Sequence, residues 1–409
     1  MDNNAQRPFD LIVFGATSFV GQILCRHLVE RHGTEGPLKW AIAGRDLAKL
    51  DLIAQETGAE VERIVADAHD APALALLAES TRVVVSTVGP YALYGSELVA
   101  AVAAAGTDYC DLTGEPQWMR AMIDAHGKTA EATGARIVHA CGFDSIPSDL
   151  GVWFTQQRSM ERFDSFCDRV AMRVSAAKGG ASGGTIASMM NLMEEAAGDP
   201  DLRKLLADPY ALAPTDMRSG VEQPEVTGPT HDAASGQWVA PFVMAGVNTR
   251  VVQRTHALLG RPWGREFKYD EAMMMGSGFV GGAKAAGLSA GILSGMGLAA
   301  ISPVRKLLNR FVLPKPGQGP SPDAQRTGFF ELRFFGLTPT GRAIRTQVTG
   351  ERDPGYGCTA RMLGEAAIAL LDLDPNKVGG GFWTPATAFG DQLIEQLEAH
   401  AGVRFNVLI

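Results

Sequence analysis

The chain has 409 residues, of which 46% are hydrophobic and 20% are charged, a composition typical of globular proteins. Its length predicts two or three domains, each large enough to bury a core. With 37 basic against 45 acidic residues, the net charge of −8 argues against a nucleic-acid partner, which requires a dense basic face. The five cysteines are scattered and never spaced as CxxC, so they indicate neither a disulfide framework nor a metal site.

The first ten residues, MDNNAQRPFD, lack the basic stretch and the apolar stretch of a secretory signal. We therefore expect a cytoplasmic protein.

Residues 1–150 alternate short β-branched runs with amphipathic stretches, the pattern of a Rossmann-type, doubly wound parallel sheet. The expected strands are Leu11–Phe14, Trp40–Ala43, Arg63–Ala66, Arg82–Thr87, Tyr109–Leu112 and Arg136–Ala140. The expected helices are Val20–Arg31, Leu47–Thr57, Ser96–Ala105 and Gln117–Ala132.

The pattern changes in residues 151–355, for which we expect a mixed α+β, largely antiparallel domain that serves substrate binding and forms a homodimer. Expected strands are Phe166–Ser175, Arg250–Leu258 and the pair Phe329–Phe335 with Ala343–Val348. The compositions of Asp199–Gln237 and Pro314–Asp323 predict surface loops. In residues 356–409 we expect helices at Thr359–Leu371 and Thr387–His400 that return to the first domain.

The strongest local signal is the sequence GATSFVG between the first strand and the first helix, a pattern that predicts a turn binding the pyrophosphate of a dinucleotide. Glycine permits the sharp turn at its first position and close helix packing at its last. Serine replaces the middle glycine of the usual motif and could hydrogen-bond a phosphate. The cofactor-binding residues expected here are Gly15, Ala16, Thr17, Ser18, Phe19, Val20 and Gly21.

The second strand ends at Arg45 rather than at the acidic residue that binds the ribose of NAD. Arginine suits a 2′-phosphate, so we expect NADP(H) as cofactor. The alternative is a surface arginine paired with Asp67 or Asp70. Asp46 could cap the next helix or bind the ribose, and Asp67 could meet the adenine amino group.

The residues that follow the fourth strand lie at the carboxyl edge of the predicted sheet, where such folds bind ligands. Further cofactor contacts are expected there from Thr87, Val88, Gly89 and Pro90. Tyr91 and Tyr94 come next and are candidate catalytic residues, because a phenol can donate a proton. Packing of either ring at the domain interface is the alternative.

The loop after the sixth strand holds Cys141 and Gly142, which we expect to contact the cofactor, and the candidate catalytic residues Asp144 and Ser145. Asp144 or Ser145 could instead cap the following helix. Cys141 could donate a proton or simply be buried. Asp111 and Glu115, after the fifth strand, are open to loop hydrogen bonding or to acid–base work.

Residues 272–304 include an apolar, glycine-rich segment in which Ala285–Val304 carries no formal charge. Three interpretations are open: a buried helical hairpin, a peripheral membrane or lipid contact, and a membrane span. Gly287, Gly291 and Gly295 would line one helix face.

Four motifs together resemble the saccharopine dehydrogenase-like oxidoreductases, in particular the trans-acting enoyl reductase branch. They are GATSFVG, the stretch from Ser86 to Trp118 with VGPYALYG and DLTGE, CGFDSIPSDLG from Cys141, and DPGYGCTARMLGEAA from Asp353. The resemblance spans nearly the whole chain and implies an NADP-binding Rossmann domain, a mixed substrate domain and C-terminal residues that rejoin the first domain. True saccharopine reductases have a GLDPGIDH-like string where this chain has GFDSIPSD, which argues against saccharopine as substrate.

The resulting hypothesis is an NADP-dependent reductase of a carbon–carbon double bond in a lipid-like acyl thioester, carried by a separate synthase or carrier protein. One rival is a non-catalytic nucleotide-binding protein at a lipid surface. Another is a saccharopine-type amino-acid dehydrogenase.

Overall fold

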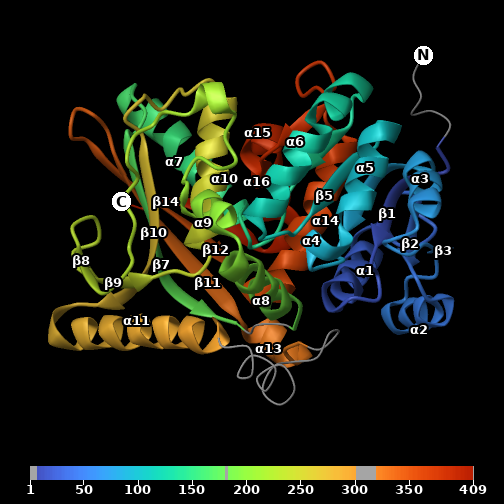
Figure 1. Ribbon diagram of the computed structural model, residues 1–409, viewed down its shortest axis with the longest axis horizontal. Coiled ribbons are helices and arrows are strands. Elements are labelled where there is room, and N and C mark those ends of the chain that lie inside the picture. Colours follow the sequence, from blue (N-terminus) through green and yellow to red (C-terminus); the bar gives the residue numbers. More distant parts are fainter. Residues whose placement is uncertain (1–6, 180–182, 301–318, 409) are drawn as a thin grey trace.

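The computed structural model describes residues 7–179, 183–300 and 319–408, and has two lobes, each built on one sheet (Figure 1). The N-terminal lobe, blue to cyan in the figure, holds the first sheet. The second lobe holds the other sheet and, along its lower edge, the long helix α11. Segments from the C-terminal part of the chain, drawn in orange and red, belong to both lobes.

The first sheet has seven strands in the order β13-β6-β5-β4-β1-β2-β3, and every neighbouring pair is parallel. Its central strands are apolar and buried because helices cover both faces. The strands are β1 (Phe9–Phe14), β2 (Trp40–Gly44), β3 (Glu62–Val65), β4 (Thr81–Ser86), β5 (Asp108–Asp111), β6 (Arg136–Val138) and β13 (Gly381–Trp383). The predicted doubly wound fold is confirmed.

The helices of this lobe begin at residues that favour helix starts. Asp46 and Asp70 accept hydrogen bonds from backbone amides three residues later, as helix-capping residues do. The helices are α1 (Phe19–His32), α2 (Leu47–Thr57), α3 (Ala71–Glu79), α4 (Tyr91–Tyr94), α5 (Ser96–Ala105) and α6 (Pro116–Thr133). The capping role expected for Asp46 is confirmed.

The second sheet has the order β14-β12-β11-β7-β10-β9-β8, and only β7 and β10 pair in parallel. This confirms a largely antiparallel second sheet. Its strands are β7 (Arg169–Lys178), β8 (Thr230–Asp232), β9 (Gln237–Pro241), β10 (Lys268–Gly276), β11 (Phe329–Leu337), β12 (Ala343–Gly350) and β14 (Val403–Leu408).

Helix α7 (Ile146–Phe163) packs tightly on this sheet through Gly151, since a Cβ there would lie 2.1 Å from the Phe334 ring. Beside it lies α10 (Ala245–Leu258), so the prediction of a strand at Arg250–Leu258 is wrong. The alternation was misleading because α10 is enclosed by neighbours on nearly every side, and even polar members such as Gln253 are buried. A helix buried all round leaves no polar stripe to reveal its period.

Part of the predicted loop Asp199–Gln237 is ordered as α9 (Pro200–Ala207), a 3-10 turn at Thr215–Met217 and strand β8. Helix α8 (Gly183–Gly198) precedes it, and the short helix α13 (Pro322–Thr327) overlaps the end of the predicted loop Pro314–Asp323. The remainder of that second loop, up to residue 318, lies outside the described residues.

The C-terminal residues serve both lobes. Helix α14 (Thr359–Leu371) packs against α1 and against β4 and β5, and β13 extends the first sheet, whereas β14 forms an edge of the second sheet. The single helix expected at Thr387–His400 is wrong. The chain forms α15 (Pro385–Phe389), α16 (Asp391–Gln396) and a π-helical turn (Leu397–Ala401), with a break at Gly390, where φ is 51°.

The apolar segment forms one continuous helix, α11 (Gly278–Ala300), so the interpretation as a buried hairpin is wrong for the described part. Residues 301–304 of that segment lie outside the described residues. The glycine face is not packed either, because a Cβ at Gly287, Gly291 or Gly295 would meet nothing within 4 Å. Among the described helices none is long and apolar enough to cross a membrane.

Candidate active site

The turn between β1 and α1 has the backbone shape that the sequence requires. Gly15 has a φ of 90°, a conformation that favours glycine. A Cβ at Gly21 would lie 2.4 Å from the carbonyl oxygen of Gly15, so only glycine allows the helix to start this close to the turn. The turn is therefore the narrow strand-to-helix connection of dinucleotide-binding folds.

Ser18 joins this turn to the neighbouring strand. Its hydroxyl accepts a hydrogen bond from the amide of Gly21 and donates to Thr87 Oγ1 at 2.9 Å. The Thr87 hydroxyl in turn donates to the carbonyl oxygen of Gly15 at 2.9 Å. The hydroxyl of Ser18 is thus committed to the protein, and it holds the turn against the end of β4.

Two amides at the start of α1 point to an anion site. The N–H groups of Phe19 and Val20 have no acceptor among the described residues, and a helix N-terminus carries partial positive charge. The Phe19 ring lies edge-on against Tyr356 at 5.1 Å, and a Cβ at Gly319 would lie 2.3 Å from it. The DPGYG motif therefore packs directly against the turn. Free amides, Gly15 and Gly21 together fit the pyrophosphate of a dinucleotide.

On the β2 and β3 side of the sheet, Arg45 is exposed and takes part in none of the ion pairs found among the described residues. The alternative pairing with Asp67 or Asp70 is therefore not seen there. Asp67 instead accepts a hydrogen bond from the amide of His69. The Tyr94 ring lies 5.5 Å from the His69 ring, which places Tyr94 on this side of the sheet.

The loop after β4 carries Thr87, Val88, Gly89 and a cis-linked Pro90. Val88 lies beside the turn, since a Cβ at Gly15 would be 2.5 Å from its Cγ2. The following amides, those of Tyr91 and Ala92, donate to the carboxylate of Glu115 at 2.8 and 3.0 Å.

Glu115 also accepts a hydrogen bond from Ser188 Oγ, a residue of α8, at 2.9 Å. Burial raises the pKa of Glu115, although its two amide donors oppose that change. Its contacts are loop hydrogen bonds, and they tie the second lobe to this edge of the first sheet.

Tyr91 is buried, and its hydroxyl donates to the carbonyl oxygen of Ser86 and accepts from the amide of Leu112. Burial, reinforced by the charge of Asp111, raises the pKa of Tyr91 well above its usual value. Tyr91 thus ties the β4 loop to the β5 loop.

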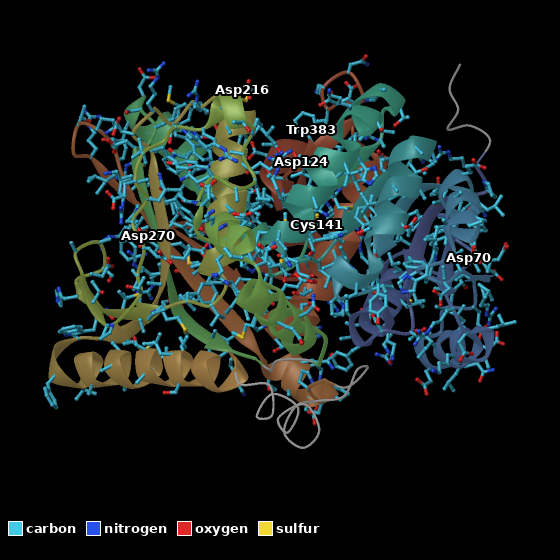
Figure 2. The ribbon with its side chains drawn as sticks, viewed as in Figure 1. Asp70, Asp124, Cys141, Asp216, Asp270 and Trp383 are labelled. Atoms are coloured by element: carbon cyan, nitrogen blue, oxygen red, sulfur yellow. The ribbon has the colours of Figure 1, made fainter. Side chains whose placement is uncertain are left out.

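The loop after β6 brings Cys141, Gly142 and Asp144 to the same edge. Figure 2 shows Cys141 near the middle of the view, between the two lobes. Cys141 is fully buried, and burial raises the pKa of its thiol well above the usual value. A Cβ at Gly142 would lie 2.7 Å from Asp144 Oδ2 and 2.9 Å from Thr359 Cγ2. A side chain at position 142 would therefore have to displace Asp144 or Thr359.

Asp144 is half-buried, and desolvation raises the pKa of its carboxyl to about 7, with a further contribution from the charge of Asp111. Its Oδ1 would lie 3.5 Å from a Cβ at Gly114. Asp144 is accordingly half protonated near neutrality.

Ser145 occupies the N-cap position of α7, but its side chain does not cap the helix, so the capping alternative is wrong for Ser145. Its hydroxyl donates to Asn248 Oδ1 at 2.9 Å. The Asn248 amide donates to Glu271, which also accepts from the Tyr269 hydroxyl at 2.7 Å. Desolvation raises the pKa of Glu271 to about 7. This buried network fixes the start of α7 to the second lobe.

We did not predict the pairing of His139 with Asp111. His139 Nδ1 lies 2.7 Å from Asp111 Oδ2, and both residues are buried. The parallel register of β5 and β6 pairs Cys110 with Val138, so one further step along each strand brings Asp111 beside His139. Asp111 also accepts from the amide of Ala140, which has a φ of 58°, and so holds the loop that carries Asp144.

The structure therefore gathers the phosphate turn, the β4 loop and Asp144 at one sheet edge. Arg45, Asp67 and Tyr94 lie at its β3 end. Ser145, Asn248 and Glu271 form the adjoining contact with the second lobe.

Related chains extend over nearly the same length as this one. A protein from Mycobacterium tuberculosis named as a trans-acting enoyl reductase is 42% identical over 97% of both chains. Trans-acting enoyl reductases from Mycobacterium bovis and Mycobacterium ulcerans are 38% and 37% identical, and cover 98% and 97% of this chain and 97% of their own. No protein-family model matches the chain.

Solved structures with the same fold are more distant in sequence. Saccharopine dehydrogenase (L-Glu forming) from Saccharomyces cerevisiae superposes with a TM-score of 0.55 at 11% identity, over 98% of this chain and 100% of its own. Homospermidine synthase from Legionella pneumophila, solved in complex with NAD, superposes with a TM-score of 0.51 at 10% identity, over 99% and 93%. The chain has the fold of these dehydrogenase-like proteins and, by its sequence, belongs to the trans-acting enoyl reductase family of oxidoreductases.

Proposed function

We propose that the protein reduces the carbon–carbon double bond of an enoyl thioester with NADPH as the electron donor. The observation that carries the proposal is Asp144, a half-buried carboxyl with a pKa near 7 at the sheet edge that also holds the free amides of the phosphate turn. The names of the mycobacterial relatives support the substrate class. The acyl group is proposed to arrive on a separate carrier protein or synthase.

The cofactor would be held by two parts of the first sheet. The amides of Phe19 and Val20 would bind its pyrophosphate, and the exposed guanidinium of Arg45 would bind a 2′-phosphate. The absence of an ion pair for Arg45 among the described residues favours this role over a structural one. When bound, the nicotinamide supplies the hydride for the β-carbon of the substrate.

The chain's own contribution is the proton. Addition of hydride to the β-carbon leaves an enolate, and the α-carbon must then take up a proton. Asp144 holds such a proton below a pH of about 7. Tyr91 and Ser145 are less suited to this step because their hydroxyls are bound to Ser86 and Asn248.

The test is NADPH oxidation in the presence of trans-2-enoyl thioesters of increasing chain length, with the product identified by mass. We expect a saturated acyl thioester, and a decrease in kcat of about 100-fold or more in Asp144→Asn. Tyr94→Phe is the control. Tyr94 lies beside His69 at the β3 end of the sheet, so this variant should retain kcat. No turnover of any enoyl thioester would contradict the proposed substrate class.

A further inference from the structure

Helix α11 has an unusual distribution of side chains. Its buried residues, Gly281, Ala285 and Ser289, recur every four positions and lie on the side that packs against β9 and β10. A Cβ at Gly282 would lie 3.3 Å from the Trp238 ring of β9, so the helix is seated closely. The fully buried positions of α11 are thus all small residues, and the half-buried Leu288 and Ile292 flank them.

Three large apolar side chains of α11 point away from the protein, whereas Leu288 and Ile292 are half-buried. Phe279 is 91% exposed, and Val280 and Leu293 are each 63% exposed. At about 100° per residue, the exposed positions from Phe279 to Gly295 cover one continuous arc of about 200°. Its members are Phe279, Val280, Ala283, Lys284, Ala286, Gly287, Ala290, Gly291, Leu293, Ser294 and Gly295. We call this arc the outer face of α11.

Burial within the chain does not account for this face. A helix on the surface of a globular protein normally turns charged and polar residues to water. The outer face carries a single charge, Lys284, near one margin of the arc. A contiguous exposed apolar surface of this kind marks an interaction site.

The charges of this part of the chain indicate the occupant. From residue 278 to residue 318 the sequence contains no Asp or Glu, although the whole chain has a net charge of −8. Its basic residues are Lys284, Arg305, Lys306, Arg310 and Lys315. A second copy would present the same outer face, with no acidic group to pair with Lys284. Anionic lipid headgroups supply that opposite charge.

We propose that the outer face of α11 binds the surface of a bilayer that contains anionic lipids, with the helix lying parallel to the membrane plane. In this position Phe279, Val280 and Leu293 enter the interfacial layer, and the Lys284 ammonium reaches the headgroups at the margin. Lying in the membrane plane, a helix of this length, about 34 Å, provides an extended contact. The inference is independent of the reaction proposed above.

The test is flotation of the full chain with phosphatidylcholine vesicles, with and without phosphatidylglycerol. We expect flotation that increases with the anionic lipid and decreases with salt, because the charge term is screened. The double variant Phe279→Glu, Leu293→Glu should lower the vesicle partition coefficient about tenfold or more. Leu52→Glu, Leu76→Glu is the matched control, because Leu52 and Leu76 are 52% and 70% exposed on α2 and α3 in the other lobe, and it should float like the parent chain.

A second measurement reads the orientation directly. The five native cysteines are all buried and unpaired, so an environment-sensitive thiol label can be directed to Phe279→Cys and, as control, to Leu76→Cys. On addition of anionic vesicles the fluorescence emission of the label at position 279 should shift to shorter wavelength, and that of the label at position 76 should not. No flotation of the parent chain, or equal flotation of the double variant, would overturn the proposal. So would a lipid-independent dimer that the double variant separates, since a second copy would then be the occupant.

Discussion

The hydroxyls of Ser18 and Thr87 lie 2.9 Å apart and join the phosphate turn to the loop after β4. The usual motif has glycine where this chain has Ser18. Here the serine hydroxyl caps α1 through the amide of Gly21 and donates to Thr87, which itself donates to the carbonyl oxygen of Gly15. The serine that departs from the motif therefore provides a hydrogen-bonded link between the two segments that would lie along a dinucleotide.

Removal of this hydrogen-bonded link should weaken cofactor binding. In Thr87→Val the Ser18 hydroxyl loses its acceptor and the turn loses its side-chain hydrogen bonds to Thr87, so the dissociation constant for NADPH should rise about tenfold. Fluorescence titration with NADPH measures this. Thr57→Val is the matched control, because Thr57 also donates to a backbone carbonyl and is buried, but lies on α2. An unchanged dissociation constant in Thr87→Val would show that the link has no role in binding.

Arg45→Ala should separate the two nucleotides. Loss of a charged hydrogen-bond donor to the 2′-phosphate should raise the dissociation constant for NADPH about 10- to 100-fold, and leave that for NADH unchanged. Thermal-shift titrations with each nucleotide provide the measurement. Arg63→Ala serves as control because Arg63 pairs with Glu60 and Asp51. Equal effects on both nucleotides would argue against a 2′-phosphate contact.

The reaction rate should depend on pH through Asp144. Its pKa in the folded protein is raised to about 7, so the carboxyl carries its proton below that pH and loses it above. The kcat for enoyl reduction should therefore decrease as pH rises through about 7. The residual rate of Asp144→Asn should not show this decrease. A parent rate that stays constant from pH 6 to pH 9, values set about one to two units around the pKa, would exclude Asp144 as the proton donor.

Asp111→Asn should shift the pH at which the rate decreases. The Asp111 charge contributes to the raised pKa of Asp144, so its removal lowers that pKa, and the decrease in rate should begin at lower pH. Asparagine keeps an oxygen for the amide of Ala140, which preserves the loop. A reduced rate with an unshifted pH dependence would mean that Asp111 acts through the loop geometry alone.

Stability should depend on pH through the buried Asp149. Desolvation raises its folded-state pKa to about 7, above the ordinary 3.8, so the folded state binds the proton more tightly than the unfolded state. The proton on Asp149 therefore contributes its full stabilisation of the folded state below about pH 4, and this stabilisation is lost as pH rises to about 7. The free energy of unfolding should decrease by about 3 kcal/mol from this cause between pH 5 and 8. Urea unfolding at both pH values should show that Asp149→Asn loses this component. An identical pH dependence in parent and variant would refute it.

Much of the first lobe was predictable because parallel strands buried on both faces leave uniform apolar runs, and because Gly15 and Gly21 mark a tight turn from strand to helix. The same signals located Arg45, Thr87 and Asp144 at the sheet edge. Their partners were harder to predict. Ser188 and Asn248 come from α8 and α10, far along the chain, and nothing local in the sequence indicates that they contact Glu115 and Ser145.

The second lobe was less predictable for a physical reason. Helix α10 is buried nearly all round, so its 3.6-residue period is hidden, and Arg250–Leu258 resembles a strand. In α11 burial does not follow hydrophobicity, since Ala285 is buried while Phe279 is exposed. The pairing of His139 with Asp111 depends on the register of β5 and β6. Once that register is known, the pairing follows directly.

The most direct test of the proposed reaction follows the hydrogen that is transferred. NADPH carrying deuterium at both positions of the nicotinamide C4, the carbon that donates the hydride, would be incubated with the protein and a trans-2-enoyl thioester, and the product analysed by mass spectrometry and NMR. We predict one deuterium on the β-carbon and a solvent-derived hydrogen on the α-carbon. A saturated product without deuterium, or no saturated product while the protein binds NADPH, would contradict the assignment as an enoyl reductase.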